Sequence, residues 1–272
     1  MIIDGHCHIV DEYLPILRRM DELGIDKTVL VGVGVKDLDV VKIDDSLIFK
    51  HDLLFRTLGV LKARKISRSR KFRETLVENP FNDAMLLAIR ERPDRFYGFA
   101  FVNPKSDYAL DEIRRCLDAG ACGIKLALLQ YPTDLSGERM NRICGIAQQE
   151  HVPVFFHQGL TRESSNASDM IKRFKDVDFI IAHAGVQYFR EAVELAKDNS
   201  NIYIDTSSYI VTEEKIRYLY TALGAGKLIF GSDYPVMSKD PGEGLEKIRR
   251  LKCPDADTGR MLGLNILGLL GK

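Results

Sequence analysis

The chain has 272 residues, of which 45% are hydrophobic and 29% charged, and its 39 basic residues balance its 39 acidic residues. This composition is ordinary for a globular protein, and zero net charge argues against a broad nucleic-acid-binding surface. The five cysteines form no C-x-x-C pair, so we expect reduced thiols in a cytoplasmic protein. We expect no signal peptide, because a strand begins at residue 2, and no membrane span, because no apolar run approaches about 20 residues.

Eight short apolar segments are interpreted as β-strands, with helical segments between them. Most are nearly continuous apolar runs such as Val29–Val31, which suit parallel strands that are buried on both faces. Strands that alternate with helices in this way predict an α/β protein, a single (β/α)8 TIM barrel spanning residues 1–272. The predicted strands cover residues 2–9, 27–34, 96–103, 122–129, 152–158, 178–184, 201–207 and 227–233.

The connection between the second and third predicted strands is unusually long, at about 60 residues, where a simple crossover needs far fewer. Residues 82–92 are predicted to form the ordinary helix of this unit, which leaves an insertion of roughly residues 35–80. The insertion follows the C-terminal end of a strand, where barrels of this kind carry their active sites. We therefore interpret it as a lid, from which His51 could reach the site; a surface elaboration or an oligomer contact is the alternative.

His6 and His8 lie in the first predicted strand, within the sequence Asp4-Gly5-His6-Cys7-His8. Residues two apart on a strand face the same side, so both imidazoles are expected to point the same way, together with Asp4. Imidazole binds zinc and other borderline cations. The pair is therefore half of a candidate metal site, although two exposed histidines near a chain end would give the same pattern.

Other polar residues fall at the C-terminal ends of later predicted strands. His157 ends the fifth, His183 the sixth, and Asp233 the eighth. Four of the six histidines thus lie at strand ends that a barrel brings to one rim. We predict that these side chains form a metal site.

The same motifs resemble those of the amidohydrolase superfamily: D-x-H-x-H in the first strand, a histidine in the fifth and sixth, and G-S-D-x-P in the eighth. The closer resemblance is to the amidohydrolase-related branch that includes aminocarboxymuconate-semialdehyde decarboxylase. Three further segments are similar to that branch, namely residues 92–100 (RPDRFYGFA), 123–126 (GIKL) and 259–270 (GRMLGLNILGLL).

The resemblance implies one divalent metal ion, zinc in the first instance, with manganese or iron as alternatives; a second metal is not expected. His6, His8, His157 and Asp233 would be its ligands. Asp233 would also take a proton from the metal-activated water and pass it to the leaving group, and His183 would orient the water or polarise the substrate.

Lys125 and Arg162 are the candidate substrate-binding residues. Lys125 lies in the fourth predicted strand, where binuclear members of the superfamily carry a carboxylated lysine; a substrate contact is our first interpretation, with a carboxylated bridge and a structural ion pair as alternatives. Arg162 follows His157 and could hold a substrate carboxylate, because guanidinium suits bidentate pairing. A solvated side chain is the alternative.

The sequence therefore predicts a metal-dependent hydrolase acting on a C–N or C–O bond of a small organic substrate. A non-oxidative decarboxylase or C–C hydrolase at the same site is the alternative. A TatD-like deoxyribonuclease is disfavoured, because Lys125 stands where that family places a glutamate, and a non-catalytic barrel is disfavoured because every expected ligand is present. We expect neither nucleic acid nor membrane as a partner, and a homodimer as the default assembly.

Overall fold

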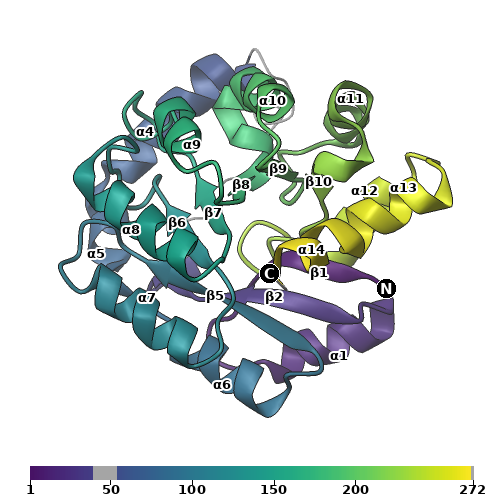
Figure 1. The fold of residues 1–272 in the computed structure, drawn as a ribbon, viewed down its shortest axis with the longest axis horizontal. Coiled ribbons are helices and arrows are strands. Elements are labelled where there is room, and N and C mark those ends of the chain that lie inside the picture. The colour runs from purple at the N-terminus through teal and green to yellow at the C-terminus, as the bar shows by residue number, and fades with distance from the viewer. Residues whose placement is uncertain (39–53, 271–272) are drawn as a thin grey trace.

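Eight parallel strands form a barrel whose outer face is covered by helices (Figure 1). The computed structural model describes residues 1–38 and 54–270. Neighbouring strands pair in the order β1-β2-β5-β6-β7-β8-β9-β10. This confirms the predicted single (β/α)8 barrel, and each predicted strand segment contains one barrel strand. They are β1 (Ile3–His8), β2 (Lys27–Val31), β5 (Phe96–Val102), β6 (Ile124–Ala127), β7 (Val154–His157), β8 (Phe179–Ile181), β9 (Ile202–Asp205) and β10 (Leu228–Ile229).

The first and last strands close the barrel through a few bonds rather than a full ladder. Gly5 N donates to Phe230 O at 2.8 Å, and His8 N donates to Tyr234 O at 2.7 Å. An isolated parallel bridge joins Cys7 to Tyr234. The histidines of β1 consequently lie beside the segment that follows β10.

Helices with one apolar face cover the outside of the barrel. In α7, for example, Ala109, Ile113 and Cys116 are buried at helical spacing. Gly24 ends α1 in the left-handed conformation that glycine adopts readily, with φ 68°. The helices that follow barrel strands are α1 (Leu14–Leu23), α6 (Asp83–Glu91), α7 (Ala109–Asp118), α8 (Glu138–Gln149), α9 (Ser168–Arg173), α10 (Phe189–Asp198), α11 (Glu213–Leu223) and α12 (Pro241–Arg249). Short 3-10 turns η3 (Ala182–Tyr188) and η4 (Ala225–Lys227) precede α10 and β10, and α13 (Asp255–Gly259), the π-helical turn η5 (Arg260–Leu264) and α14 (Asn265–Leu270) end the chain.

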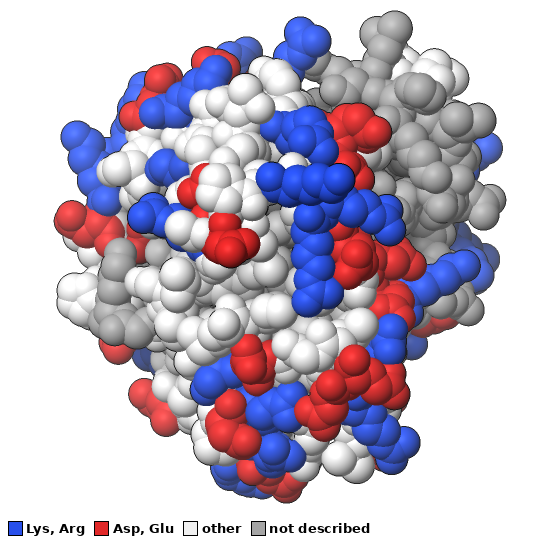
Figure 2. Space-filling view, turned by 90° about the vertical axis from the view of Figure 1, so that its right-hand side faces the viewer, with Lys and Arg blue, Asp and Glu red and all other residues white. Residues whose placement is uncertain are grey.

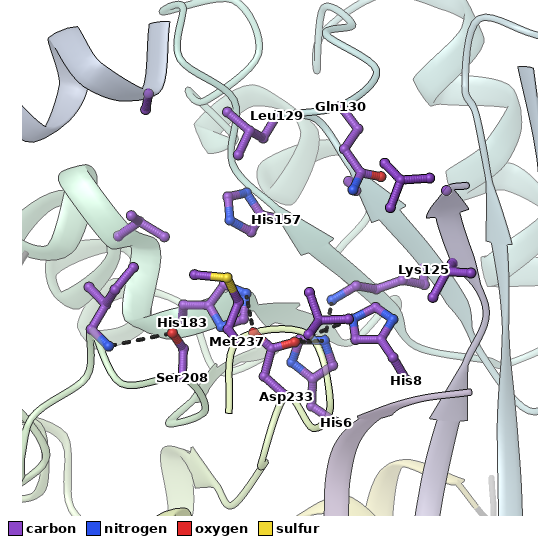
Figure 3. A pocket seen from close by; sticks show the side chains of 18 of the residues that line it. His6, His8, Lys125, Leu129, Gln130, His157, His183, Ser208, Asp233 and Met237 are labelled. Atoms are coloured by element: carbon purple, nitrogen blue, oxygen red, sulfur yellow. Dashed lines mark hydrogen bonds and ion pairs between the residues drawn. The ribbon is translucent and has the colours of Figure 1, made fainter. Parts of the chain in front are cut away.

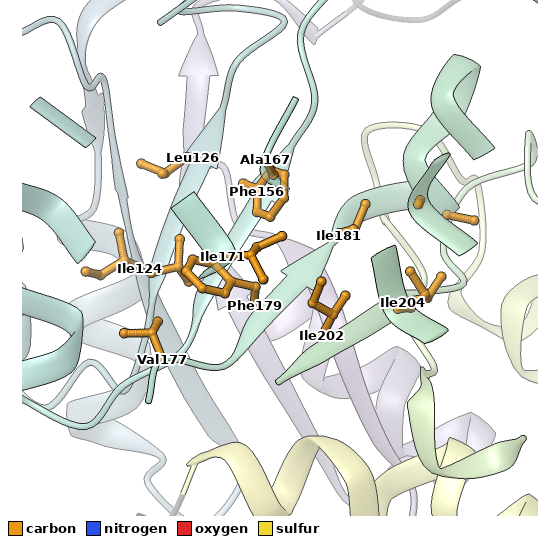
Figure 4. Packing of buried hydrophobic residues seen from close by; sticks show 14 of the residues in the cluster. Ile124, Leu126, Phe156, Ala167, Ile171, Val177, Phe179, Ile181, Ile202 and Ile204 are labelled. Atoms are coloured by element: carbon orange, nitrogen blue, oxygen red, sulfur yellow. The ribbon is translucent and has the colours of Figure 1, made fainter. Parts of the chain in front are cut away.

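Alternate residues of the strands build two apolar layers. Side chains such as Val31, Phe101 and Phe155 come from different strands yet form one buried cluster, which places that cluster inside the barrel. Their neighbours along the strands pack outward beneath the helices. Figure 4 shows this outer layer over β6 to β9, with Ile124, Leu126, Phe156, Ala167, Ile171, Val177, Phe179, Ile181, Ile202 and Ile204 in contact. Apolar side chains thus fill the barrel below its mouth.

The segment between β2 and β5 adds a second, two-stranded sheet that the sequence did not indicate. In it β3 (Val33–Val35) pairs antiparallel with β4 (Leu76–Phe81). The prediction of one continuous strand over residues 27–34 is therefore wrong, because the chain leaves the barrel at Gly32. The carbonyl oxygen of Phe81 would lie 2.0 Å from any Cβ at Gly32, so the two segments approach too closely for a side chain. Between β3 and β4 the described elements are η2 (Phe55–Gly59), α4 (Val60–Ser67) and α5 (Arg70–Thr75). His51, with the rest of residues 39–53, lies outside the described residues, and the lid role of the insertion stays a prediction.

An extra residue in β1 breaks the expected alternation. Asp4 lies opposite Thr28 and Cys7 lies opposite Leu30, so three steps along β1 match two along β2. Asp4 and His6 therefore do not share a face through simple alternation. The Asp4 carboxylate instead accepts a hydrogen bond from the backbone N of His6 at 3.1 Å and fixes the local path of the strand.

The surface carries both signs of charge. Figure 2 shows Lys and Arg side chains interspersed with Asp and Glu on one face, as the balanced composition leads one to expect. The five cysteines are unpaired. Within residues 1–38 and 54–270 no helix combines the length and apolar character needed to cross a membrane.

Candidate metal centre

Polar side chains from both ends of the chain meet in one cavity at the mouth of the barrel. The cavity has a volume of about 130 Å³. His6 and His8 of β1, His157 at the end of β7, His183 in η3 and Asp233 after β10 all line it. These are the residues that the sequence placed at strand ends, and Figure 3 shows their side chains around a common space.

Three of the four predicted ligands form a tight group. The Nε2 atom of His8 lies 3.3 Å from Asp233 Oδ1, and the Nε2 atom of His6 lies 3.8 Å from the same oxygen. One ligand atom from each residue falls within 4.8 Å of the others, a spacing suited to a single cation. Asp233 holds its position in a left-handed backbone conformation, φ 59°, and its backbone N donates to His6 O at 2.7 Å.

Burial favours the neutral imidazole at His6, His157 and His183. It lowers the pKa of His6 and His183 well below the ordinary histidine value and that of His157 to about 4, and the nearby charge of Lys125 adds to the effect. A neutral imidazole offers a lone pair, the form that binds a metal ion. These three histidines are therefore in the right state for a cation without first losing a proton.

Asp233 supplies the clearest indication that the cavity suits a cation. Its Oδ2 atom is buried and has no hydrogen-bond partner among the described residues. Burial also raises the pKa of this carboxyl, because a desolvated charge lacks the compensation that water would give. Two imidazoles and a carboxylate with one unpartnered oxygen match the ligand types of zinc and related ions.

His157 lies in the cavity but apart from the group of three. Its Nδ1 atom lies 2.7 Å from the carbonyl oxygen of Gln158, and its ring centroid is 5.0 Å from that of His183. A hydrogen bond from Nδ1 to a carbonyl leaves Nε2 free for a ligand. His157 as a metal ligand stays a prediction.

His183 faces the group from the opposite side. Its Nε2 atom lies 3.6 Å from Asp233 Oδ2, and its backbone is left-handed with φ 50°. Val186, in the same turn, has φ 50° as well, which is unusual for a β-branched residue. The strained turn directs the His183 imidazole at the carboxylate, as the role of orienting a water or substrate would require.

The two predicted substrate-binding residues differ in position. Lys125 lines the cavity from β6, with Nζ 3.1 Å from His6 Nε2 and 3.5 Å from the Phe155 ring centroid, and burial lowers its pKa to about 8. Its nearest described contacts are an imidazole and a ring, while the carboxylates of Asp205 and Asp233 act on its charge and raise its pKa, so the structural ion pair stays an alternative. The structure does not bring Arg162 to the cavity: its side chain is exposed, and the described cavity lining does not include it.

The sequence reasoning missed Asp205 and Ser207, which lie directly behind the histidines. Asp205 is fully buried at the end of β9, with Oδ2 3.2 Å from His6 Nδ1. The signal was present, since residues 205–207 (DTS) lie at the C-terminal end of the predicted strand 201–207, as the histidines lie at the ends of theirs.

The rest of the cavity is mainly apolar. Its described lining contains Lys125 as the only lysine or arginine. The apolar side chains are Val33, Val35, Leu38, Val60, Ala63, Phe72, Phe101, Ala127, Leu129, Leu160, Val186, Ile210, Val236 and Met237. Besides the histidines, Asp233 and Lys125, the polar side chains of the described lining are Gln130, Gln187 and Ser208.

Comparison with known proteins agrees with this arrangement. A family model described as amidohydrolase matches residues 3–272. Similar solved structures include a 2,6-dihydroxybenzoate decarboxylase with 2,6-dihydroxybenzoate bound (TM-score 0.67, 16% identity, covering 100% of this chain and 99% of that one). Another is a probable 2-pyrone-4,6-dicarboxylic acid hydrolase from Acinetobacter baumannii with citric acid bound (TM-score 0.67, 16% identity, covering 100% of this chain and 99% of that one). A third is a 5-carboxyvanillate decarboxylase from Novosphingobium aromaticivorans with manganese and 4-hydroxy-3-methoxy-5-nitrobenzoic acid (TM-score 0.65, 14% identity, covering 100% of this chain and 96% of that one). At these identities the likeness shows the fold alone, and no curated protein matches the chain.

Proposed function

The chain belongs to the amidohydrolase family, and from that premise we propose that it is a metal-dependent hydrolase. The reaction is attack of a metal-activated water on a C–N or C–O bond of a small organic substrate. One observation carries the proposal: among the described residues the buried Asp233 Oδ2 has no hydrogen-bond partner, while His183 Nε2 lies 3.6 Å from it and His8 Nε2 lies 3.3 Å from the other oxygen, Oδ1. A buried carboxylate oxygen without a hydrogen-bond partner is suited both to binding a cation and to accepting a proton.

The residues of this chain have distinct roles in the proposed reaction. His6, His8, His157 and Asp233 would hold the cation, which when bound supplies Lewis-acid chemistry and lowers the pKa of a water. Asp233 accepts the proton of the attacking water and delivers it to the leaving nitrogen or oxygen. His183 holds the water or the substrate carbonyl in line. The apolar walls exclude other water and receive the organic part of the substrate.

Zinc is the first candidate for the cation, because two or three imidazoles and one carboxylate suit it. Manganese is the main alternative, since a structure of similar fold was obtained with manganese. These ligand types accept several first-row metals, so availability decides between them as much as affinity.

Decarboxylation is the second candidate function. It is favoured by the substrates named for similar structures, which are aromatic carboxylates. The cavity is compatible with such a substrate, because its apolar walls would contact a ring while the cation and Lys125 face the carboxylate.

Product analysis separates the two reactions. We would incubate the zinc- or manganese-loaded protein with lactones, amides and aromatic carboxylates, and measure acid release, amine release and CO₂. Hydrolysis products without CO₂ support the hydrolase. Release of CO₂ from an aromatic carboxylate, without hydrolysis of lactones or amides, would show that the protein is a decarboxylase and not a hydrolase. Inactivity of the metal-loaded protein on all three classes would count against both functions.

We also propose that the insertion shapes the substrate pocket. Ala63 of α4 and Phe72 of α5 line the cavity, and Arg64 Nη2 donates to Leu160 O at 3.2 Å, which links α4 to the loop after β7. The insertion thus closes one side of the substrate space.

Enlarging Ala63 tests this role. Ala63→Phe should raise KM for the bulkier substrates about 10-fold or more, because the ring enters the cavity, while Tm changes little. The matched control is Leu61→Phe, since Leu61 lies on the same helix with 60% of its surface exposed. Equal kinetics for Ala63→Phe and wild type across all substrates would show that α4 does not select substrates.

A further inference from the structure

Asp205 and Ser207 form a compact buried unit behind the histidines of the metal centre. Both are 0% exposed. The unit is packed against Gly231, where an added Cβ would lie 2.4 Å from Asp205 Oδ1 and 2.7 Å from His6 Cβ. A glycine is therefore required for this close approach, which indicates that the positions of the carboxylate and the imidazole are tightly set.

The carboxylate of Asp205 is saturated with donors. Its Oδ2 atom accepts from the backbone N of His183 at 3.0 Å and lies 2.5 Å from Ser207 Oγ and 3.2 Å from His6 Nδ1. Its Oδ1 atom accepts from the backbone N of Ser207 at 3.1 Å. With four such contacts, the carboxylate is a hydrogen-bond acceptor within the protein rather than a free metal ligand. His6, His183 and Asp205 also lie close enough together to suggest a second candidate cation site, and these hydrogen bonds account for that grouping.

A count of protons fixes the histidine tautomers. The Ser207 hydroxyl has one proton and donates it to Asp205 Oδ2, because an ionised carboxylate can only accept. Ser207 Oγ also lies 3.0 Å from His6 Nδ1 and 2.9 Å from His183 Nδ1. Since the hydroxyl proton is already committed, each of these nitrogens must be the donor. Both histidines then carry their proton on Nδ1 and a lone pair on Nε2.

Two contacts on the other side of the rings agree with this count. The ammonium of Lys125 has only donors, and it lies 3.1 Å from His6 Nε2, so that nitrogen must be an acceptor. The His183 Nε2 atom lies 3.6 Å from Asp233 Oδ2, too far for a hydrogen bond, and this separation is compatible with a lone pair on that nitrogen.

We infer that Asp205 and Ser207 are positioning residues that hold His6 and His183 together in the Nδ1–H tautomer, with both Nε2 lone pairs facing Asp233. The Asp205–Ser207 pair thus fixes the tautomer of a predicted metal ligand, His6, and that of a predicted catalytic residue, His183. The consequence for metal affinity rests on the proposed function; the tautomers themselves do not. Groups that orient metal-binding histidines in this way are commonly worth 10- to 100-fold in affinity.

The test combines nitrogen NMR with metal titration. The protein is labelled with ¹⁵N in its six histidines, and a long-range ¹H–¹⁵N correlation spectrum should show the Nδ1–H tautomer for His6 and His183. The signals are assigned from variants that each replace one histidine. Ser207→Ala should give a mixture of tautomers for His183. Asp205→Asn should weaken zinc binding about 10- to 100-fold. Thr206→Ala is the matched control, because this neighbouring buried hydroxyl donates to Ile229 O instead and its loss should change neither readout.

Each result decides a separate point. Nε2–H tautomers for His6 and His183 in the unaltered protein would overturn the inference, even if Asp205→Asn failed to fold. Unchanged zinc affinity and tautomers in both Asp205→Asn and Ser207→Ala would overturn it as well. Nδ1–H tautomers in a protein that takes up neither zinc nor manganese would leave the inference standing and remove the proposed function.

Discussion

Asp233→Asn should lower kcat by about 10³-fold, the range expected when a proton-transfer group is removed from its site. The amide has nearly the same shape but cannot accept the proton of the attacking water. It also removes the negative charge that the cation requires. The measurement is steady-state kinetics on the substrate class identified by product analysis, with thermal unfolding of the same preparation.

The fold should tolerate this change. Asp233 Oδ2 makes no hydrogen bond that the amide would break, and the backbone bond from Asp233 N to His6 O is kept. Asp240→Asn is a suitable control, because Asp240 caps α12 and pairs with Arg19 away from the cavity, and its loss should affect Tm more than kcat. Full activity in Asp233→Asn would rule out the proton-transfer role.

The rim of the barrel could be predicted because it depends on local periodicity and one topological rule. Apolar runs located the strands, and the rule that strand C-termini share one face brought His6, His157 and Asp233 together from positions far apart in the chain. Those side chains now line one cavity. Neither step required knowledge of which loops lie above them.

Features that depend on long-range contacts were not accessible in the same way. The β3–β4 pair joins residues 41 to 48 positions apart (Val35 with Leu76, Val33 with Phe81), and neither strand has an apolar run long enough to predict the pairing. The extra residue in β1 is visible only in its register with β2. Arg162 shows the same limit, since following His157 in sequence does not determine which way its side chain points.

Asp205 is a different kind of omission. It ends its strand as the histidines end theirs, so the rule applied, but a single carboxylate followed by threonine and serine carries no metal-site signature. Its significance depends on His6 and Ser207 lying within hydrogen-bond distance, which only the folded chain reveals.

The purified protein should contain close to one divalent ion per chain, measured by elemental analysis after mild purification. His6→Ala and His8→Ala should each lose most of it, because each removes one of the grouped ligands. His151→Ala should keep it, since His151 is exposed just before β7, away from the cavity. Free metal at 100 times its Kd stabilises the folded state by about 2.7 kcal/mol, so chelation should lower Tm by several degrees.

The stoichiometry also decides the role of Lys125. A carboxylated lysine that bridges two ions requires two metals per chain, whereas a substrate contact requires one. The contacts favour one, because the other candidate grouping is held by hydrogen bonds among Asp205, His6 and His183 that a second ion would have to break. Two ions per chain, together with a mass increase at Lys125 that matches carboxylation, would show that these hydrogen bonds break when a second ion binds. No uptake of zinc or manganese by a folded chain would mean that the unpartnered oxygen of Asp233 does not serve a cation.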